Sequence, residues 1–341
     1  MRLALDAMGG DNAPAAAVEG AVLYARKAPS DTVILVGDEP RLAAELARLK
    51  ARGAVQVVHA PDVVGLDEHP ATAVRRKKSS SLRVAFDLVA QHAADAVVSV
   101  GSTGAALAAG LLVLGRLPGV ERPAVIIMLP KMKGGFAALL DSGANVTCRP
   151  SHLSLFAHLG EVWARRALSI DRPRVALLSN GSERARGTDL TRAALGLLER
   201  SALNFIGYVE GNDLFADAAD VIVTDGFTGN VVLKTTEGAA WALGATLKRE
   251  VEAHSTARVG AWLARPAFVA FRKITDWAEY GGAPLLGVDG VAIIGHGRSG
   301  PRAFRNALRA ASHAASLQLG PELSQAATAA SALCKLSARE E

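Results

Sequence analysis

The residues best suited to chemistry lie in one glycine-bordered turn, at positions 224–230, which reads Thr-Asp-Gly-Phe-Thr-Gly-Asn. The turn follows an apolar run and precedes a long amphipathic pattern, so we expect a short buried strand that turns into a helix. The first N–H groups of a helix lack intrahelical partners, and the helix dipole adds partial positive charge there. Gly226 and Gly229 let a ligand come close, while Thr228 and Asn230 add neutral hydrogen-bonding groups. The pattern indicates a site for phosphate or a developing oxyanion, and the alternative is a turn with no further role.

Four other glycine-bearing turns each follow a predicted strand, at positions 6–11, 101–104, 141–145 and 179–183. In an open parallel sheet such turns gather outside the carboxyl ends of the strands, where ligands bind. We therefore expect these turns to meet at one edge of the sheet. The candidate residues for binding phosphate or substrate are Gly9, Gly10, Asp11, Ser102, Thr103, Gly104, Asp225, Gly226, Thr228 and Gly229.

Apolar runs and amphipathic stretches alternate along the 341 residues, of which 50% are apolar. This alternation predicts an α/β fold with a mostly parallel, Rossmann-like sheet between two layers of helices. We expect one α/β/α domain over residues 1–341, with two interlocked lobes as the alternative. The expected strands are 2–5, 32–36, 55–59, 96–100, 124–129, 136–140, 174–178, 204–209, 220–224 and 291–294. The expected helices are 13–27, 40–51, 82–93, 102–114, 151–167, 188–201 and 229–252, and two more within 302–338 that break around Gly320.

Composition restricts the setting and the partners. Cys148 and Cys334 are the two cysteines, which suggests no disulfide framework and a reducing cytosol. No signal peptide and no uncharged apolar run of about 18 residues is evident, so we expect no membrane-spanning helix. The net charge of +5 favours acidic partners. Nucleic acid is not expected, because no binding motif or aromatic-interleaved basic strip is present.

Residues 253–280 combine bulky apolar and basic side chains. Basic residues beside bulky apolar ones are typical of a helix that lies on an anionic membrane surface. A dimer-interface or core helix needs the same apolar stripe and is the alternative. The candidate membrane contacts are Val259, Trp262, Leu263, Phe268 and Phe271, and Ile274 and Trp277 continue the spacing.

Four motifs together resemble the bacterial phosphate acyltransferase family: the turn at 6–11, the basic run at 73–80, the turn at 224–230, and Glu-Tyr-Gly-Gly-Ala-Pro-Leu-Leu-Gly at 279–287. The likeness runs in order from residue 1 to about residue 310. These enzymes convert acyl-(acyl carrier protein) and inorganic phosphate into acyl phosphate for phospholipid synthesis. The resemblance implies a homodimeric fold like that of the isocitrate and isopropylmalate dehydrogenases and of phosphotransacetylase, with no metal and no cofactor.

The resemblance also implies a cellular setting. It places the enzyme in the cytoplasm, peripherally at the inner face of the membrane, upstream of a glycerol-3-phosphate acyltransferase. In this family the helices that correspond to 253–280 project from the dimer and dock on the membrane, which favours the membrane interpretation of that segment.

Three departures from the family pattern bear on residue roles. Ser102 stands where the family usually has Asn, Arg186 where it has Lys, and Arg298 where it has Ser. Arg186 keeps the positive charge, but a planar guanidinium is not geometrically equivalent to an ammonium. By resemblance, Arg186 and Asn230 are the first catalytic candidates: a cation that holds phosphate, and a donor to phosphate or to the oxyanion.

Other polar residues have two readings each. His296 could donate a hydrogen bond or protonate the leaving thiolate, or it could be a satisfied structural histidine. Arg75, Lys77 and Lys78 could bind phosphate or meet the acidic carrier protein at the rim of the site, or they could be a solvated charge run. Asp6, Asp11, Asp141 and Asp225 are expected to orient basic groups or to cap helices rather than to hold Mg²⁺.

Three rival functions remain open on the sequence. An acyl-CoA or acetyl-CoA phosphotransferase would share the fold and the chemistry but use a nucleotide-bearing donor. A decarboxylating dehydrogenase of the same fold would need nicotinamide and a metal-bound carboxylate. A non-enzymatic membrane scaffold for lipid-synthesis enzymes would use only segment 253–280.

Overall fold

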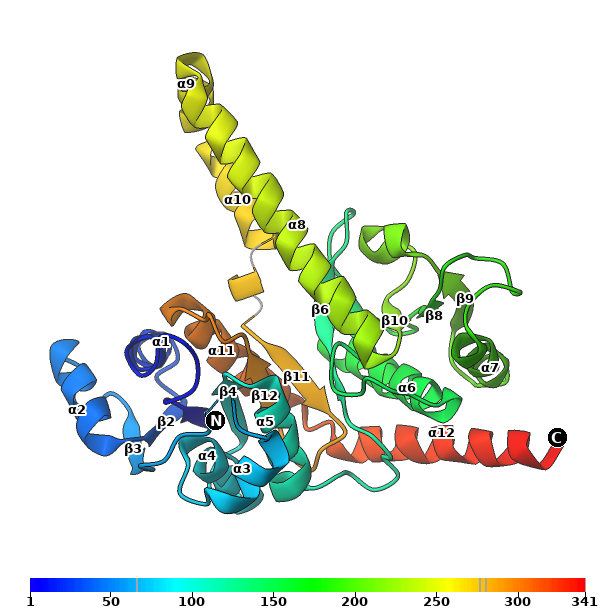
Figure 1. Cartoon of the computed structure of the whole chain (residues 1–341), viewed down its shortest axis with the longest axis horizontal. Coiled ribbons are helices and arrows are strands. Elements are labelled where there is room, and N and C mark those ends of the chain that lie inside the picture. The colour runs from blue at the N-terminus through cyan, green and yellow to red at the C-terminus, as the bar shows by residue number, and fades with distance from the viewer. Residues whose placement is uncertain (66, 276, 280, 341) are drawn as a thin grey trace.

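The computed structural model describes residues 1–65, 67–275, 277–279 and 281–340, shown in Figure 1. The side chains at 272–277 and 337–340 are outside the described part, so the membrane-facing roles of Ile274 and Trp277 and the position of Tyr280 lie outside it as well.

The first half of the fold is a seven-stranded sheet in the order β3-β2-β1-β4-β12-β11-β5. Its pairs are parallel except at β11, which runs antiparallel to both neighbours. The strands are β1 (Arg2–Asp6), β2 (Thr32–Gly37), β3 (Gln56–His59), β4 (Ala96–Val100), β5 (Ala124–Val125), β11 (Ala283–Leu286) and β12 (Ala292–Gly295).

The second half is a five-stranded sheet in the order β6-β7-β10-β8-β9, with β6 antiparallel to β7 and the other pairs parallel. Its strands are β6 (Ile127–Pro130), β7 (Phe136–Leu140), β8 (Val175–Leu178), β9 (Phe205–Val209) and β10 (Val221–Val223). The single strand expected at 124–129 is therefore wrong. The chain pairs with β11 up to Val125, crosses at Ile126, and then pairs with β7.

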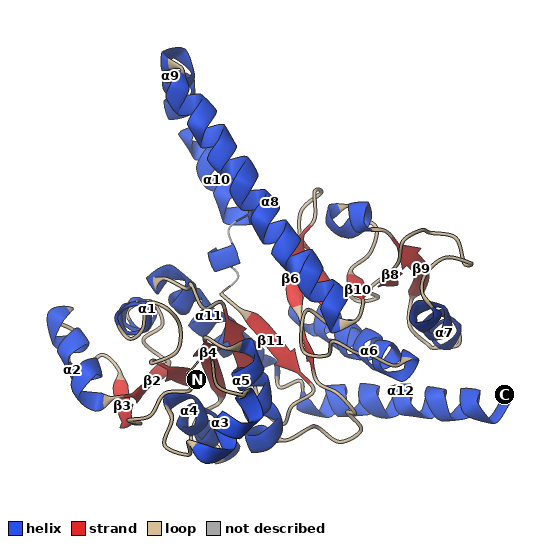
Figure 2. Cartoon of the chain, in the orientation of Figure 1, coloured by secondary structure: helices blue, strands red, loops and turns tan. Residues whose placement is uncertain are grey.

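Helices flank both sheets (Figure 2). The helices of regular α type are α1 (Ala15–Ala25), α2 (Glu39–Arg48), α3 (Pro70–Arg76), α4 (Ser81–Ala90), α5 (Thr103–Ala109), α6 (Pro150–Ala167), α7 (Asp189–Leu198), α8 (Gly226–Ala253), α9 (Ser255–Leu263), α10 (Arg265–Thr275), α11 (Pro301–Leu317) and α12 (Gly320–Glu340). A π-helix, Gly110–Leu114, continues α5, and 3-10 turns cover Gly211–Phe215 and Trp277–Glu279.

Strand periodicity explains why each sheet is covered on two faces. Leu3 and Leu5 belong to one buried cluster, with α1 and α11, whereas Ala4 belongs to another, with α4 and α5. Successive side chains of a strand point to opposite faces, so strands buried on both sides read as continuous apolar runs. The same alternation separates Leu140 from Leu139 in the second sheet.

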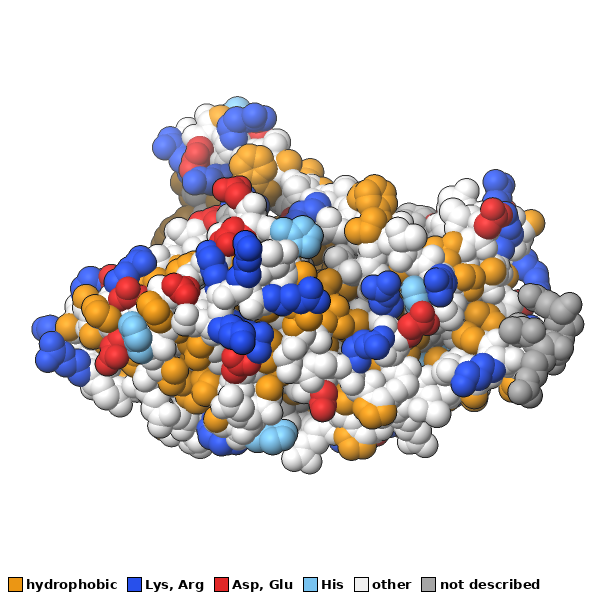
Figure 3. Space-filling model, turned by 60° about the horizontal axis from the view of Figure 1, so that its bottom comes forward, with side chains coloured by type: hydrophobic (Ala, Val, Ile, Leu, Met, Phe, Trp, Pro, Cys, Tyr) orange, Lys and Arg blue, Asp and Glu red, His pale blue; other side chains and the backbone are white. Residues whose placement is uncertain are grey.

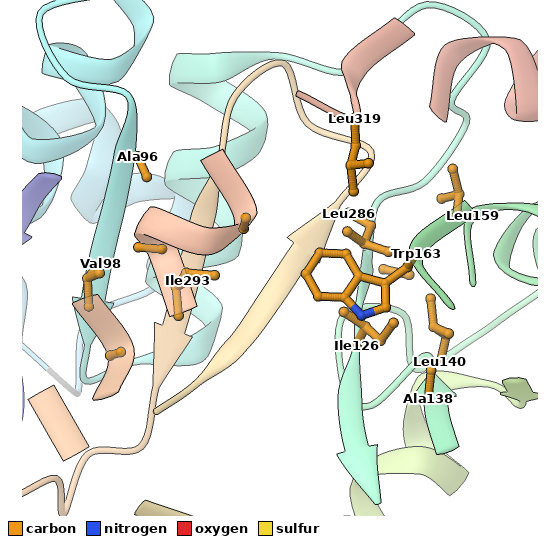
Figure 4. Packing of buried hydrophobic residues seen from close by; sticks show 14 of the residues in the cluster. Ala96, Val98, Ile126, Ala138, Leu140, Leu159, Trp163, Leu286, Ile293 and Leu319 are labelled. Atoms are coloured by element: carbon orange, nitrogen blue, oxygen red, sulfur yellow. The ribbon is translucent and has the colours of Figure 1, made fainter. Parts of the chain in front are cut away.

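One apolar cluster joins the two sheets. It includes Val98 and Ile293 of the first sheet, Leu140 of the second, and Trp163 of α6. Figure 4 shows Trp163 close to Ile126, the residue at which the chain passes from one sheet to the other. Burying such a side chain contributes about 1.5–3 kcal/mol, so the shared cluster fixes the two sheets relative to one another.

Helix α8 begins at the second sheet and extends well beyond both sheets, and α9 and α10 fold back along it (Figure 1). We call the part of α8 beyond residue 240, together with α9 and α10, the arm. Large apolar side chains on the arm are exposed, with Trp241 at 76% and Trp262 at 71% of full accessibility. Within the described residues, no helix is both long enough and apolar enough to cross a bilayer.

Candidate active site

The start of α8 carries its own capping carboxylate. Asp225 accepts the backbone N–H of Thr228 at 2.9 Å and the Thr228 hydroxyl at 2.8 Å. The Gly229 amide donates to the Asp225 carbonyl, and the Gly226 amide donates to the carbonyl of Asn145. These amides already have protein acceptors, so an anion at this helix start would compete with Asp225. The expectation that Asp225 caps a helix is confirmed.

The loop after β7 packs tightly beneath this helix start. Asp141 is fully buried and accepts backbone N–H groups from Val125, Gly143, Ala144 and Asn145 at 2.7 to 3.1 Å. A Cβ on Gly226 would collide with the backbone of Asn145, and one on Gly229 with the carbonyl of Asp141. The two glycines are therefore required for helix-to-loop packing, which leaves the exposed Asn230 side chain beside Gly143.

Three turns of the first sheet also pack against one another. Asp6, only 3% exposed, accepts the Ser99 hydroxyl at 3.1 Å and the Met8 amide at 3.3 Å, and burial raises the pKa of its carboxyl. Gly10, at φ +89°, lies against Gly101 and the carbonyl of Gly297. The amide of Asp11 donates to that same carbonyl at 2.9 Å. The turns after β1, β4 and β12 thus form one surface.

Lys234 connects this surface to α8. Its Nζ lies 3.2 Å from Nε2 of His296 and 2.9 Å from Oε2 of Glu237. Asn230, Lys234 and Glu237 are spaced i, i+4, i+7, which places them on one face of α8. That face meets the loop after β12 through Lys234 and His296, so the start of α8 reaches the turns of the first sheet.

Sequence reasoning missed Lys234 and Glu237. On a long amphipathic helix, two charged residues three positions apart are ordinarily a solvated pair. The signal that could have found them is their spacing from Asn230, which shares their helix face.

Both the ring and the backbone of His296 are held by the residues that follow it. Its Nδ1 accepts the Arg298 amide at 3.1 Å, and its carbonyl accepts the Ser299 hydroxyl at 2.6 Å. Partial burial, followed by the charge of Lys234, lowers the pKa of the imidazole. The ring is therefore neutral at pH 7 and can both donate and accept a hydrogen bond.

The basic candidates lie apart from this meeting point. Arg186, 57% exposed, pairs with Glu183 at 3.3 Å in the loop after β8. Lys77 is bound to Glu68 at 2.5 Å and to the carbonyl of Val63 at 2.8 Å, while Arg75 and Lys78 are exposed. The partners of Arg186 and Lys77 thus belong to their own loops, not to α8 or to the loop after β12.

The basic run spans the end of a helix: Pro70 opens α3, Arg75 and Arg76 lie in its last turn, and Lys77 and Lys78 follow it. Pro70 contacts Gly104, so α3 lies beside the start of α5. There Ser102 caps the helix by accepting the Ala105 amide at 3.2 Å, and Thr103 and Gly104 are exposed.

Two further types of chemistry have little support. Burial raises the pKa of Cys148 to about 11, so its thiolate, the form that attacks, is scarce at neutral pH. Across the described ranges, no group of three or more His, Cys, Asp or Glu side chains is arranged to hold a metal ion.

Solved structures define the fold class. The chain is similar to a phosphotransacetylase from Streptococcus pyogenes, with a TM-score of 0.58 at 17% identity over 92% of this chain and 94% of the other. It is similar to the EutD phosphotransacetylase from Staphylococcus aureus, with a TM-score of 0.57 at 15% identity and the same two coverages. The chain therefore has an α/β fold similar to that of these two proteins, which confirms the predicted fold class.

Sequence relatives give the family. Residues 1–320 match the family described as fatty acid synthesis protein. The chain is 56% identical over 314 residues to the phosphate acyltransferase of Myxococcus xanthus (strain DK1622), covering 91% of this chain and 89% of that protein. It is 51% identical over 310 residues to the phosphate acyltransferase of Geotalea uraniireducens (strain Rf4), at the same coverages. The chain belongs to this family of phosphate acyltransferases, so it is an acyltransferase enzyme, and the resemblance of its motifs is confirmed.

Proposed function

We propose that the protein forms acyl phosphate from acyl-(acyl carrier protein) and inorganic phosphate, as an early step of phospholipid synthesis. The observation that carries this proposal is the contact of Lys234, one helical turn beyond Asn230 on α8, with His296 in the loop of the other sheet. The cluster offers an amide, an ammonium and an imidazole, which suit anion binding and oxyanion stabilisation. The names of the relatives, phosphate acyltransferase, support phosphate as the acceptor.

The reaction asks little of acid–base groups. A phosphate oxygen attacks the thioester carbonyl carbon, the carbonyl oxygen becomes an oxyanion, and the C–S bond breaks as the carbonyl reforms. The thiolate then takes a proton and leaves as the thiol. In this scheme Asn230 donates to the oxyanion, His296 donates a hydrogen bond from Nε2 to the attacking phosphate, and Arg186 adds positive charge that attracts the phosphate. Water supplies the proton that the thiolate takes.

The acyl donor is expected to be a carrier protein with an acidic surface. Arg75, Arg76 and Lys78 are exposed at the end of α3, beside the Ser102–Gly104 turn. In Figure 3, basic side chains spread across the middle of the face shown, with acidic ones among them. Opposite charge at such a rim speeds encounter and orients the partner more than it adds affinity.

The arm supports a peripheral membrane contact and a homodimer. Val259, Trp262, Leu263, Phe268 and Phe271 are exposed, and Arg258 and Arg265 are exposed among them. Figure 3 shows hydrophobic and basic side chains together on the protruding arm. Leu243 and Leu247, at i and i+4, leave an exposed apolar surface on α8 that a second copy would cover. In this proposal the enzyme works at the cytoplasmic face of the membrane and passes its product to a glycerol-3-phosphate acyltransferase.

The donor is tested by assaying acyl phosphate with purified protein, phosphate and either acyl-(acyl carrier protein) or acyl-CoA. Turnover with the carrier-bound donor and at least tenfold less with acyl-CoA supports the proposal. Preference for acyl-CoA would make the protein a phosphotransferase like its structural neighbours. No turnover with either donor, but retained binding to vesicles, would support the membrane scaffold.

The membrane contact is tested by substituting Trp262→Glu and Phe271→Glu together. Co-sedimentation with vesicles containing anionic lipid should fall sharply, because each change removes buried apolar area and adds repulsion. Activity measured without vesicles should remain. Unchanged co-sedimentation would assign these side chains to a protein interface.

A further inference from the structure

The contact between Lys234 and His296 joins the two sheets at the candidate site, and neither family motif nor sequence pattern assigned Lys234 a role. The ammonium is 51% exposed and the imidazole 22% exposed, so the pair borders solvent and can be reached by a small ion. Glu237 is 16% exposed, and its Oε2 lies 2.9 Å from the ammonium and 3.7 Å from Nε2 of His296.

The hydrogen-bond pattern makes both facing groups donors. Nδ1 of His296 accepts the Arg298 amide, so a neutral ring carries its proton on Nε2. That N–H faces the Lys234 ammonium at 3.2 Å, and an ammonium has donors and no acceptor. Two donors that converge from different elements are suited to an oxyanion with more than one acceptor oxygen.

The surrounding charges explain why a cation is needed there. Asp11 lies on the adjoining turn, with its amide bound to Gly297, and Asp225 caps the helix that carries Lys234. These two carboxylates and that of Glu237 would repel a phosphate placed nearby. Lys234, one helical turn beyond Asn230, supplies opposite charge on the same face, and Glu237 at i+3 keeps the long side chain oriented.

We propose that Lys234 Nζ and His296 Nε2 together bind the inorganic phosphate substrate, so that Lys234 is a phosphate-binding residue of the active site. The assignment rests on the proposed function and adds to it a cation, besides Arg186, that offsets the phosphate charge. It also gives α8 two neighbouring tasks: Asn230 faces the acyl carbonyl, and Lys234 holds the nucleophile beside it.

The test compares Lys234→Met, which keeps side-chain length but removes the charge, with Lys234→Arg, which keeps the charge. Lys248→Met is the matched control, because Lys248 lies on the same helix, is exposed, and pairs with Glu252 at i+4. We expect Lys234→Met to raise the KM for phosphate at least tenfold and to change the KM for the acyl donor less than twofold. Lys234→Arg should recover part of the loss, and Lys248→Met should behave as wild type.

Calorimetric titration with inorganic phosphate measures the site without turnover. Binding by the wild type that weakens at least tenfold in Lys234→Met supports the assignment, even if no acyl donor is turned over. Equal phosphate affinity in the two proteins, or an equal rise in both KM values, would overturn it. A wild type that binds phosphate but acylates none of it would instead refute the proposed function. Melting temperatures within about 2 °C of wild type exclude unfolding as the cause.

Discussion

Two charge clusters stand at opposite ends of the second sheet and are built differently. At the amino ends of β8 and β10, Lys131 and Arg174 surround Asp217 and Asp220, with Lys131 only 9% and Asp220 only 7% exposed. Arg174 donates to both carboxylates and to the Asp217 carbonyl, at 2.7 to 3.1 Å. At the other end, Lys234, Glu237 and His296 are partly exposed. There the Glu237 carboxylate is the neighbour of both Lys234 and His296.

The difference teaches how to distinguish a structural cluster from a binding site. Buried charges are tolerated only when hydrogen bonds and opposite charges surround them, so the Lys131 cluster has little capacity for a ligand. Donors that converge at a solvent-accessible boundary keep that capacity. Burial alone would raise the pKa of Asp220, but hydrogen bonds from Arg174 and Lys131 outweigh it and hold the pKa well below its ordinary value.

The largest effect is expected for Asp220→Ala. The change leaves Lys131 and part of Arg174 buried without their main counter-charge, which should cost about 3–5 kcal/mol of unfolding free energy. Urea unfolding followed by circular dichroism measures the loss. A cost below about 1 kcal/mol would mean that the cluster is no more than a surface network.

Acid should reproduce part of that loss. Because the pKa of Asp220 is lowered in the folded protein, its contribution is complete above the ordinary carboxyl pKa of about 3.9 and declines as pH falls below it. Urea unfolding at pH 5 and at pH 3 should therefore show a smaller acid-dependent decrease for Asp220→Asn than for wild type. Identical decreases would assign acid sensitivity to other carboxyls.

Substitutions in the candidate site should affect rate rather than stability. Asn230→Ala and Arg186→Ala are each expected to lower turnover at least tenfold, about 1.4 kcal/mol of barrier, because each removes a donor to a developing or bound anion. Turnover of acyl phosphate and the melting temperature are measured together. Near-normal rates in both variants would remove these residues from the site.

The smallest effect is expected at an exposed pair. Asp189 and Arg192 form an ion pair in the first turn of α7, and the Asp189 side chain is fully exposed. Asp189→Ala should change stability by less than about 1 kcal/mol, since exposed pairs contribute little. This variant calibrates the urea measurement against Asp220→Ala, and a comparable loss in both would erase the distinction between buried and exposed clusters.

The sequence predicted local elements better than their assembly. The turns that follow β1, β4, β7 and β10 are where glycines after apolar runs placed them, because a buried strand has a clear pattern. The division into two sheets was missed at Ile126, since an uninterrupted apolar run gives no sign that its ends pair with different partners. Strand β11 was missed because it is short, begins after two glycines and contains Pro284.

The candidate site was predicted in part for a related reason. Asn230, His296 and the glycines of the Gly9–Asp11 turn are residue types that suggest a binding site by themselves. The role of Lys234 depends on its contact with His296, which is 62 positions away and so outside any local sequence pattern. The roles assigned to Arg186 and to the basic run remain predictions, because contacts that would test them require a bound substrate.

The length of α8 couples two places that differ in chemistry. Its 28 residues form one unbroken rod, roughly 40 Å long at 1.5 Å per residue. Asn230 and Lys234 occupy its first turns, and the exposed tryptophans begin in the half that leaves the sheets. Because the helix is continuous, a surface that binds its far end also fixes the orientation of Asn230 and Lys234 at the near end.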